Sequence, residues 1–113
     1  MSRILLIKPR FLSLEQGGIS YPMGLMYISA TLKKYGHEPK IHDCAIDYVD
    51  FHILHRILDN WKPDFIGISI MFTDLEQTKK IMGIIRKMLP TVAVTFGGPW
   101  PSANPEESIK KYG

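Results

Sequence analysis

Residues 63–76, Pro-Asp-Phe-Ile-Gly-Ile-Ser-Ile-Met-Phe-Thr-Asp-Leu-Glu, join a short apolar segment to the start of a helix. The apolar segment, Phe65 to Met71, is rich in isoleucine, as is typical of a strand buried on both faces. Thr73 and Glu76 then have the spacing of a capping box, in which each side chain accepts a hydrogen bond from an unpaired backbone N–H. This stretch therefore predicts a strand that passes into a helix.

The same order of strand and helix occurs four times along the 113 residues. We expect strands at residues 3–8, 37–43, 65–71 and 91–96, and helices that begin near residues 22, 47, 73 and 104. Such alternation predicts an α/β domain with a doubly wound parallel sheet and helices on both faces. Because Gly113 stands where a fifth strand would begin, we expect four βα units and a missing fifth strand. Residues 1–113 would then be a single domain from the N-terminal part of a longer protein.

Apolar residues at helical spacing predict which face of each helix is buried. The first helix is expected to stop at Gly36, since glycine readily adopts a positive φ. The predicted buried faces are Leu25, Ile28, Leu32 and Tyr35 in the first helix, Ile53, Leu54, Ile57, Leu58 and Trp61 in the second, and Leu75, Thr78, Ile81, Ile85 and Met88 in the third.

The composition argues against several classes of function. The net charge of +3 is spread along the chain without a basic stripe interleaved with aromatic residues, so we expect no nucleic-acid partner. The single cysteine, Cys44, excludes an internal disulfide and a multi-cysteine metal cluster within these residues. The use of a single cysteine is compatible with a reducing compartment, so we expect a cytoplasmic location. No apolar run approaches about 20 residues, so we expect no membrane span.

Three turns follow, or nearly follow, predicted strands, at residues 20–25, 69–73 and 96–101, and they are rich in Gly, Ser and Thr. Since ligands of open parallel sheets bind at the carboxyl ends of the strands, these turns predict one composite ligand site. The usual phosphate and dinucleotide motifs of such sheets are absent. Lys8, Pro9 and Arg10 stand where a phosphoacceptor receiver domain would need acidic residues.

These turns and their surroundings resemble the cobalamin-binding domain, above all the version at the N-terminus of cobalamin-dependent radical S-adenosylmethionine enzymes. The resemblance is carried by Tyr-Pro-x-Gly-Leu at 21–25, Tyr-Gly-His-Glu at 35–38, Pro-Asp-Phe-Ile-Gly-Ile-Ser at 63–69 and Gly-Gly-Pro-x-Pro-Ser at 97–102. It covers essentially the whole chain and implies a flavodoxin-like (Rossmann-like) fold. That enzyme group includes methyltransferases and the anaerobic magnesium-protoporphyrin monomethyl ester cyclase. The resemblance therefore implies a radical methyltransferase or an oxidative cyclase as the parent protein.

The resemblance also implies a cobalamin site built from the three turns. Ser69-Ile70-Met71 stands for the family's S-x-L motif, where the small hydroxylated residue leaves room for the nucleotide tail of the cofactor. Gly97-Gly98 stands for the G-G motif, where the backbone approaches a bulky ligand closely. No catalytic residue and no metal ligand are expected in this chain. The expected cofactor-binding residues are Ser20, Tyr21, Pro22, Met23, Gly24, Asp43, Ser69, Met71, Phe72, Thr73, Gly97, Gly98, Pro99 and Trp100.

The family's D-x-H-x-x-G motif is not matched here. Ile19 stands in the place of the aspartate, and Tyr21 in the place of the histidine that ligates cobalt. Tyrosine is protonated at neutral pH and replaces histidine poorly as a ligand. The resemblance therefore implies base-off cobalamin without a protein histidine ligand. A 4Fe-4S cluster and S-adenosylmethionine would belong to an absent C-terminal radical domain, the expected partner of this one, so the chain alone is expected to be inactive.

Two alternative hypotheses stay open from the sequence. One is a vestigial interaction domain that binds no cofactor, with the crevice filled by side chains such as Tyr21 and Trp100. The other is a domain that binds a different nucleotide-like ligand at the strand ends, with a phosphate near Thr73.

Overall fold

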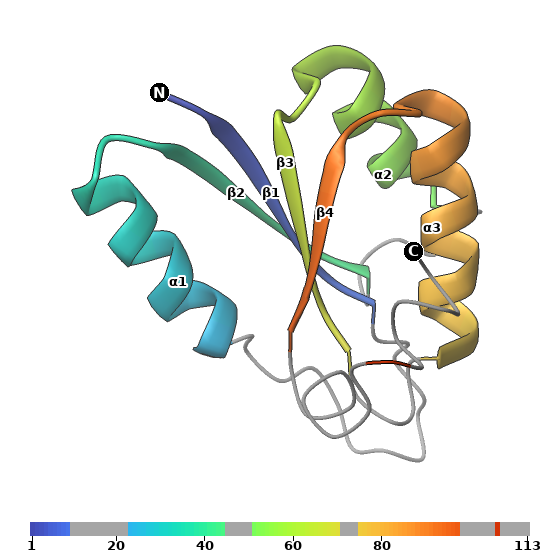
Figure 1. Cartoon of the computed structure of the whole chain (residues 1–113), viewed down its shortest axis with the longest axis horizontal. Coiled ribbons are helices and arrows are strands. Elements are labelled where there is room, and N and C mark those ends of the chain that lie inside the picture. Colours follow the sequence, from blue (N-terminus) through green and yellow to red (C-terminus); the bar gives the residue numbers. More distant parts are fainter. Residues whose placement is uncertain (10–22, 45–50, 71–74, 98–105, 107–113) are drawn as a thin grey trace.

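The computed structural model describes residues 1–9, 23–44, 51–70, 75–97 and 106. Within these residues, four strands form one parallel sheet in the order β2-β1-β3-β4 (Figure 1). The strands are β1 (Arg3–Lys8), β2 (Glu38–Asp43), β3 (Phe65–Ser69) and β4 (Ala93–Gly97). The predicted parallel α/β sheet is confirmed, with a structured strand in each expected region.

Helices lie on both sides of the sheet, as a doubly wound fold requires. Figure 1 shows α1 on one side, with α2 and α3 on the other. The helical elements are α1 (Met23–Lys34), α2 (His52–Arg56), the π-helical turn η3 (Ile57–Trp61) and α3 (Leu75–Met88). Glu106 is helical, and the rest of the helix predicted from residue 104 lies outside the described residues.

The end of α1 has the geometry of a Schellman motif. The N–H of His37 donates to the carbonyl oxygen of Leu32 over 3.0 Å, and the N–H of Gly36 donates to that of Lys33 over 3.1 Å. Gly36 adopts φ 85°, which residues with a Cβ rarely do. The predicted helix stop at Gly36 is therefore confirmed.

The hydrophobic core lies between the sheet and the layer formed by α2, η3 and α3. Successive strand side chains point to opposite faces, so alternate residues of β1 and β3 enter this core. Each fully buried Leu or Ile side chain contributes roughly 1.5–3 kcal/mol of hydrophobic stabilisation. The principal members of the hydrophobic core are Leu5, Ile7, Leu54, Leu58, Ile66, Ile68, Ile81 and Ile85.

The predicted inward face of α3 is confirmed and is wider than predicted. Thr78, Ile81 and Ile85 are fully buried, and Leu75 and Met88 are partly buried. Gln77 and Met82 are buried as well, although the apolar pattern did not include them.

The predicted buried face of α1 is wrong in part. Leu25 is buried and Leu32 is half-buried, but Ile28 and Tyr35 keep 49% and 73% of their surface exposed. The physical reason is the position of α1, which packs principally against β2 at one side of the sheet. Only a narrow line of side chains therefore meets the strands, and Ile28 and Tyr35 flank that line.

The predicted second helix, from Asp47 to Trp61, is also wrong in part. Phe51 adopts φ 57°, which is incompatible with a helical residue, so α2 begins at His52. The helix then continues as η3 and ends at Lys62, which adopts φ 51°. Leu54 and Leu58 are buried as predicted, whereas Ile53 retains 37% exposure because the helix presents it beside the core.

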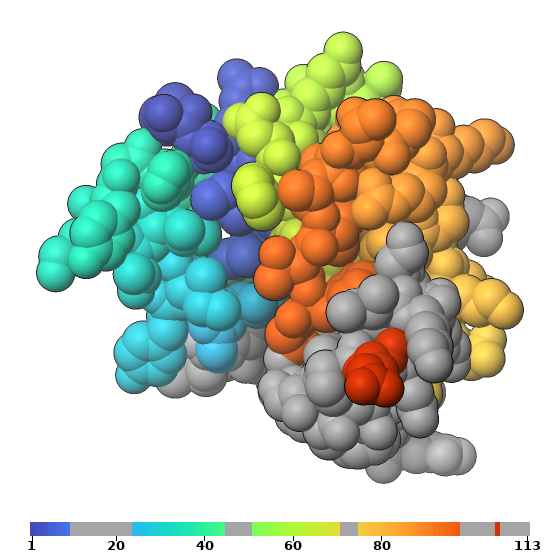
Figure 2. Space-filling view, in the orientation of Figure 1, coloured from blue at the N-terminus to red at the C-terminus, as the bar shows by residue number. Residues whose placement is uncertain are grey.

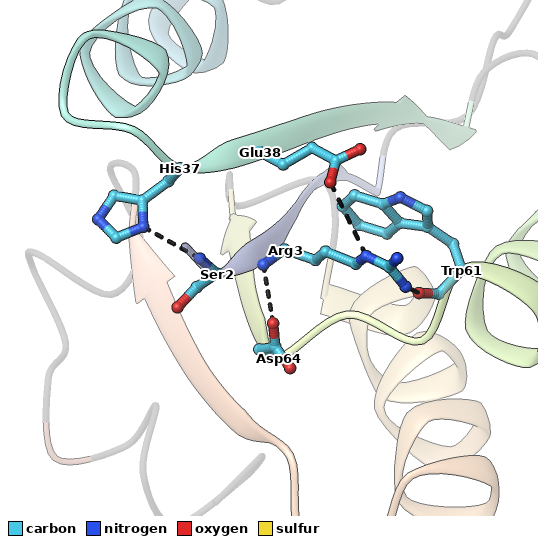
Figure 3. A network of polar contacts seen from close by, with 6 residues as sticks. All are labelled: Ser2, Arg3, His37, Glu38, Trp61 and Asp64. Carbon is cyan, nitrogen blue, oxygen red and sulfur yellow. Dashed lines mark hydrogen bonds and ion pairs between the residues drawn. The ribbon is translucent and has the colours of Figure 1, made fainter.

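A polar network ties together the amino ends of three strands (Figure 3). The N–H of Arg3 donates to Oδ2 of Asp64 over 2.8 Å, and the N–H of Asp64 donates back to the carbonyl oxygen of Arg3 over 2.8 Å. The Arg3 guanidinium also donates to the Trp61 carbonyl oxygen over 2.8 Å and lies 3.8 Å from a Glu38 carboxylate oxygen. This amino edge is therefore held by polar contacts, and the opposite, carboxyl edge is the one that ligands of such sheets use.

Candidate ligand-binding site

The carboxyl ends of the strands place predicted site residues on one edge of the sheet. β2 ends at Asp43 and pairs in register with Lys8 of β1. β3 ends at Ser69, which pairs in register with Gly97 of β4. Asp43, Ser69 and Gly97 thus come from three strands and lie at the same edge, as the sequence predicted, with β1 between the strands of Asp43 and Ser69.

The strand order defines where along this edge a ligand is expected. β1 lies between β2 and β3, and the connections after β1 and β3 lead to helices on opposite sides of the sheet. Such a topological switch point opens a crevice outside the strand ends. The point lies between the ends of β1 and β3, at Lys8 and Ser69.

One backbone contact fixes the two strand ends that carry Ser69 and Gly97. The N–H of Ile70, directly after β3, donates to the carbonyl oxygen of Gly97 over 2.7 Å. Ser69 is half-buried and Gly97 is exposed, so this part of the edge is both ordered and accessible.

On the face of β3 and β4 that points away from the core, small residues line the carboxyl part of the strands. Ile66, Ile68, Val94 and Phe96 pack toward α2 and α3, so the alternate residues point to the side on which α1 lies. We call this set the small-residue strip, and it consists of Gly67, Ser69, Thr95 and Gly97. In the space-filling view the surface is recessed between α1 and β4, with atoms of β1 visible inside the recess (Figure 2).

The two described glycines of the strip differ in the space beside them. A Cβ placed on Gly67 would lie 3.1 Å from Cδ2 of Leu6, so this glycine serves close packing within the sheet. A Cβ placed on Gly97 would meet nothing within 4 Å. Gly97 therefore leaves open space at the carboxyl edge, which is the arrangement expected where a backbone is approached by a ligand.

The start of α1 lies at the same end of the domain as the carboxyl edge (Figure 1). Met23 is its first residue, and a Cβ on the exposed Gly24 would also meet nothing within 4 Å. Three apolar side chains of the following turn are exposed. They are Met26, Tyr27 and Ile28, with 46%, 73% and 49% of their surface accessible.

Several predicted site residues cannot be placed in this geometry. The structure describes only the backbone of Met23. The residues outside the described ranges are Ser20, Tyr21, Pro22, Met71, Phe72, Thr73, Gly98, Pro99 and Trp100. Within the ranges that are described, no three His, Cys, Asp or Glu side chains gather in a way that could hold a metal ion.

Sequence reasoning missed one polar side chain near this edge. Gln77 lies in the first turn of α3 and retains 8% of its surface. It precedes the buried Ile81 by one helical turn, and this spacing was the signal that could have marked it as inward-facing. It was overlooked because an apolar pattern does not count glutamine.

The geometry defines a class of protein, the doubly wound α/β domains that bind a ligand at the carboxyl edge of a parallel sheet. Within that class the sequence matches the B12 binding domain family over residues 9–113. The chain belongs to this family, and the predicted cobalamin-binding domain is confirmed.

Two curated methyltransferases contain similar sequences. An uncharacterized methyltransferase of Pyrococcus horikoshii is 24% identical over 90 residues, which are 80% of this chain and 19% of that protein. The cytidylyl-2-hydroxyethylphosphonate methyltransferase of Streptomyces wedmorensis is 27% identical over a region covering 70% of this chain and 18% of that protein. The chain therefore spans less than a fifth of either relative.

A solved structure has the same fold. The cobalamin-dependent S-adenosylmethionine radical enzyme OxsB, with aqua-cobalamin and S-adenosylmethionine bound, matches with a TM-score of 0.81 and 21% identity. The match covers 99% of this chain and 16% of that enzyme, and it confirms the flavodoxin-like fold. None of the helices described here has both the length and the apolar character needed to cross a membrane.

Proposed function

We propose that this B12-binding domain holds base-off cobalamin without a protein histidine ligand. The observation that carries the proposal is the open space beside Gly97, next to Ser69 and at the switch point of the sheet. A cofactor as large as a corrin needs such a cradle, because side chains on adjoining strands would keep it away.

The chemistry of the described residues also supports the proposal. Ser69 offers a hydroxyl to the nucleotide tail, and the strip formed by Gly67, Ser69, Thr95 and Gly97 gives that tail a shallow surface beside α1. The exposed Tyr27 and Ile28 of α1 supply apolar surface along the same side. These residues would bind and orient the cofactor and exclude water from its tail. Cobalamin, when bound, supplies the cobalt-centred methyl-transfer chemistry.

The absence of a histidine ligand is proposed from Tyr21, which takes the histidine's place in the family motif. The test is the electron paramagnetic resonance spectrum of the protein loaded with cob(II)alamin. A nitrogen ligand on cobalt splits the lines of that spectrum, so lines without nitrogen splitting are expected. Lines split by nitrogen would overturn the base-off, histidine-free proposal. The variant Tyr21→His should introduce the splitting and serves as a positive control.

Binding itself is tested by mixing purified protein with hydroxocobalamin, removing free ligand and recording the visible spectrum. The full-length polypeptide that carries this domain should be used, with far-ultraviolet circular dichroism to establish that it is folded. Retained corrin absorbance is expected. A folded protein that retains none would overturn the proposal and favour the vestigial interaction domain.

We further propose that residues 1–113 form the N-terminal domain of a longer protein. That protein would be a radical methyltransferase or an oxidative cyclase. The support is that the similar methyltransferases and the radical enzyme OxsB are all several times longer than this chain. A C-terminal radical domain would hold the 4Fe-4S cluster and S-adenosylmethionine, and this domain alone would be inactive. The test is reductive cleavage of S-adenosylmethionine, expected from the full-length polypeptide and not from these 113 residues.

A further inference from the structure

Gln77 has a buried acceptor for which the described part of the chain offers no donor. Its Oε1 atom is sealed from solvent and has no hydrogen-bond partner among the described residues. The residue as a whole is 8% exposed. A buried carbonyl oxygen without a donor is destabilising, because folding removes its hydrogen bonds to water and returns none.

Gln77 lies in the part of α3 that is nearest to the carboxyl edge, on the core side of the sheet. β3 runs toward the carboxyl edge and ends at Ser69, and α3 begins at Leu75 and runs back (Figure 1). The first turn of α3 therefore lies at the level of the strand ends. Gln77 is on the inward side of that turn, because its neighbour Thr78 and the residue one turn on, Ile81, are both fully buried.

The chemistry of the acceptor matches what cobalamin presents. The rim of the corrin carries primary amide side chains, whose N–H groups are donors, and a glutamine carbonyl oxygen accepts from such donors. We propose that Gln77 accepts a hydrogen bond from an amide N–H of cobalamin bound at the carboxyl edge, and that its acceptor is left unpaired until the cofactor arrives. This inference rests on the proposed function, since it names a residue of the same site.

The proposal has two consequences of opposite sign. Without cofactor, replacing Gln77 by an apolar side chain of similar length removes a buried unpaired oxygen and should raise the unfolding temperature. With cofactor, the same replacement removes a hydrogen bond and should weaken binding. A glutamine that instead pairs within the apoprotein, by capping the first turn of α3 or by holding a buried water, would give a lower unfolding temperature when replaced.

The experiment compares the wild type with Gln77→Met in the full-length polypeptide that carries this domain. The unfolding midpoint without cofactor is expected to rise by roughly 4 °C, and the Kd for hydroxocobalamin to rise about tenfold. Met82→Leu is the matched control, because Met82 is a buried neighbour on the same helix and the change conserves volume. It should leave the Kd unchanged.

The outcomes separate this inference from the proposed function. An apo midpoint at or above that of the wild type, together with weaker binding, supports the role of Gln77. A lower apo midpoint, or a Kd equal to that of the wild type, overturns it while the proposed function stands. A folded wild type that retains no hydroxocobalamin overturns the proposed function, and the inference falls with it.

Discussion

The N–H of Ile70 donates to the carbonyl oxygen of Gly97 over 2.7 Å. This bond extends the ladder between β3 and β4 by one residue beyond Ser69, at the end where ligands of parallel sheets bind. The consequence is that Ser69 and Gly97 are held side by side by the backbone, whatever occupies the edge. The sheet itself therefore positions these two residues of the proposed site.

Gly97→Val should block cofactor retention without unfolding the domain. Nothing lies within 4 Å of a Cβ at this position, and valine favours strands, so the unfolding midpoint should stay the same or rise. The added methyl groups would occupy the space in which we propose that cobalamin binds, and retention should fall more than tenfold. Gly98→Val carries the same expectation from the sequence alone. The measurement is corrin absorbance after removal of free ligand.

Ala93→Val is the matched control for Gly97→Val. Ala93 lies on the same face of β4, at the amino end of the strand and away from the carboxyl edge. Its replacement should leave retention at the wild-type level. If Gly97→Val retained as much cobalamin as Ala93→Val and the wild type, Gly97 would not belong to the proposed site.

Gly67→Ala should destabilise the domain through contact with Leu6. The new Cβ would lie 3.1 Å from Cδ2 of Leu6, and Leu6 is itself only 4% exposed and has little room to move. Overpacking of this kind costs about 1 kcal/mol. Leu6→Val shortens the opposing side chain. The double variant should therefore lose less stability than the sum of the losses in the two single variants. A double-mutant cycle based on urea unfolding measures this coupling. Strictly additive losses of stability would contradict the contact.

Lys62→Gly should stabilise the domain. Lys62 ends η3 with φ 51° and an exposed side chain, so the fold holds a residue with a Cβ in a left-handed conformation that glycine adopts freely. Removing this strain should add about 1 kcal/mol to the free energy of unfolding. Lys62→Ala keeps the Cβ and should give no gain. Equal stability of the two variants would show that φ at this position is not strained.

Asp64→Ala should weaken the fold and spare the ligand site. Its carboxylate accepts the N–H of Arg3 over 2.8 Å at the amino edge, and losing such an exposed bond costs up to about 1 kcal/mol. Cofactor affinity, measured under conditions where the variant is folded, should be unchanged because the two edges are at opposite ends of the strands. A clear loss of affinity would indicate that the amino edge influences the site.

The order of elements was predictable because local rules decide it. Short isoleucine-rich runs, helical apolar spacing and Gly36 each act over a few residues, and all are seen in the structure. The start of α2 was not predictable in the same way. Phe51 adopts a positive φ although it is not glycine, so local preference gave no sign of where the helix begins. Tertiary packing of Leu54 and Leu58 into the core fixes this segment.

The candidate site, too, was predictable only in part from the sequence. The sequence alone marked Asp43, Ser69 and Gly97, because small or polar residues at the ends of predicted strands are recognisable from their neighbours. Only the tertiary structure revealed the orphan oxygen of Gln77 and the exposure of Ile28 on α1. Burial depends on which elements cover a side chain, and that is decided by segments distant in the sequence. The sequence by itself determined the order of strands and helices and the turns that carry the ligand motifs. The packing of those elements decided which side chains are exposed or unpaired.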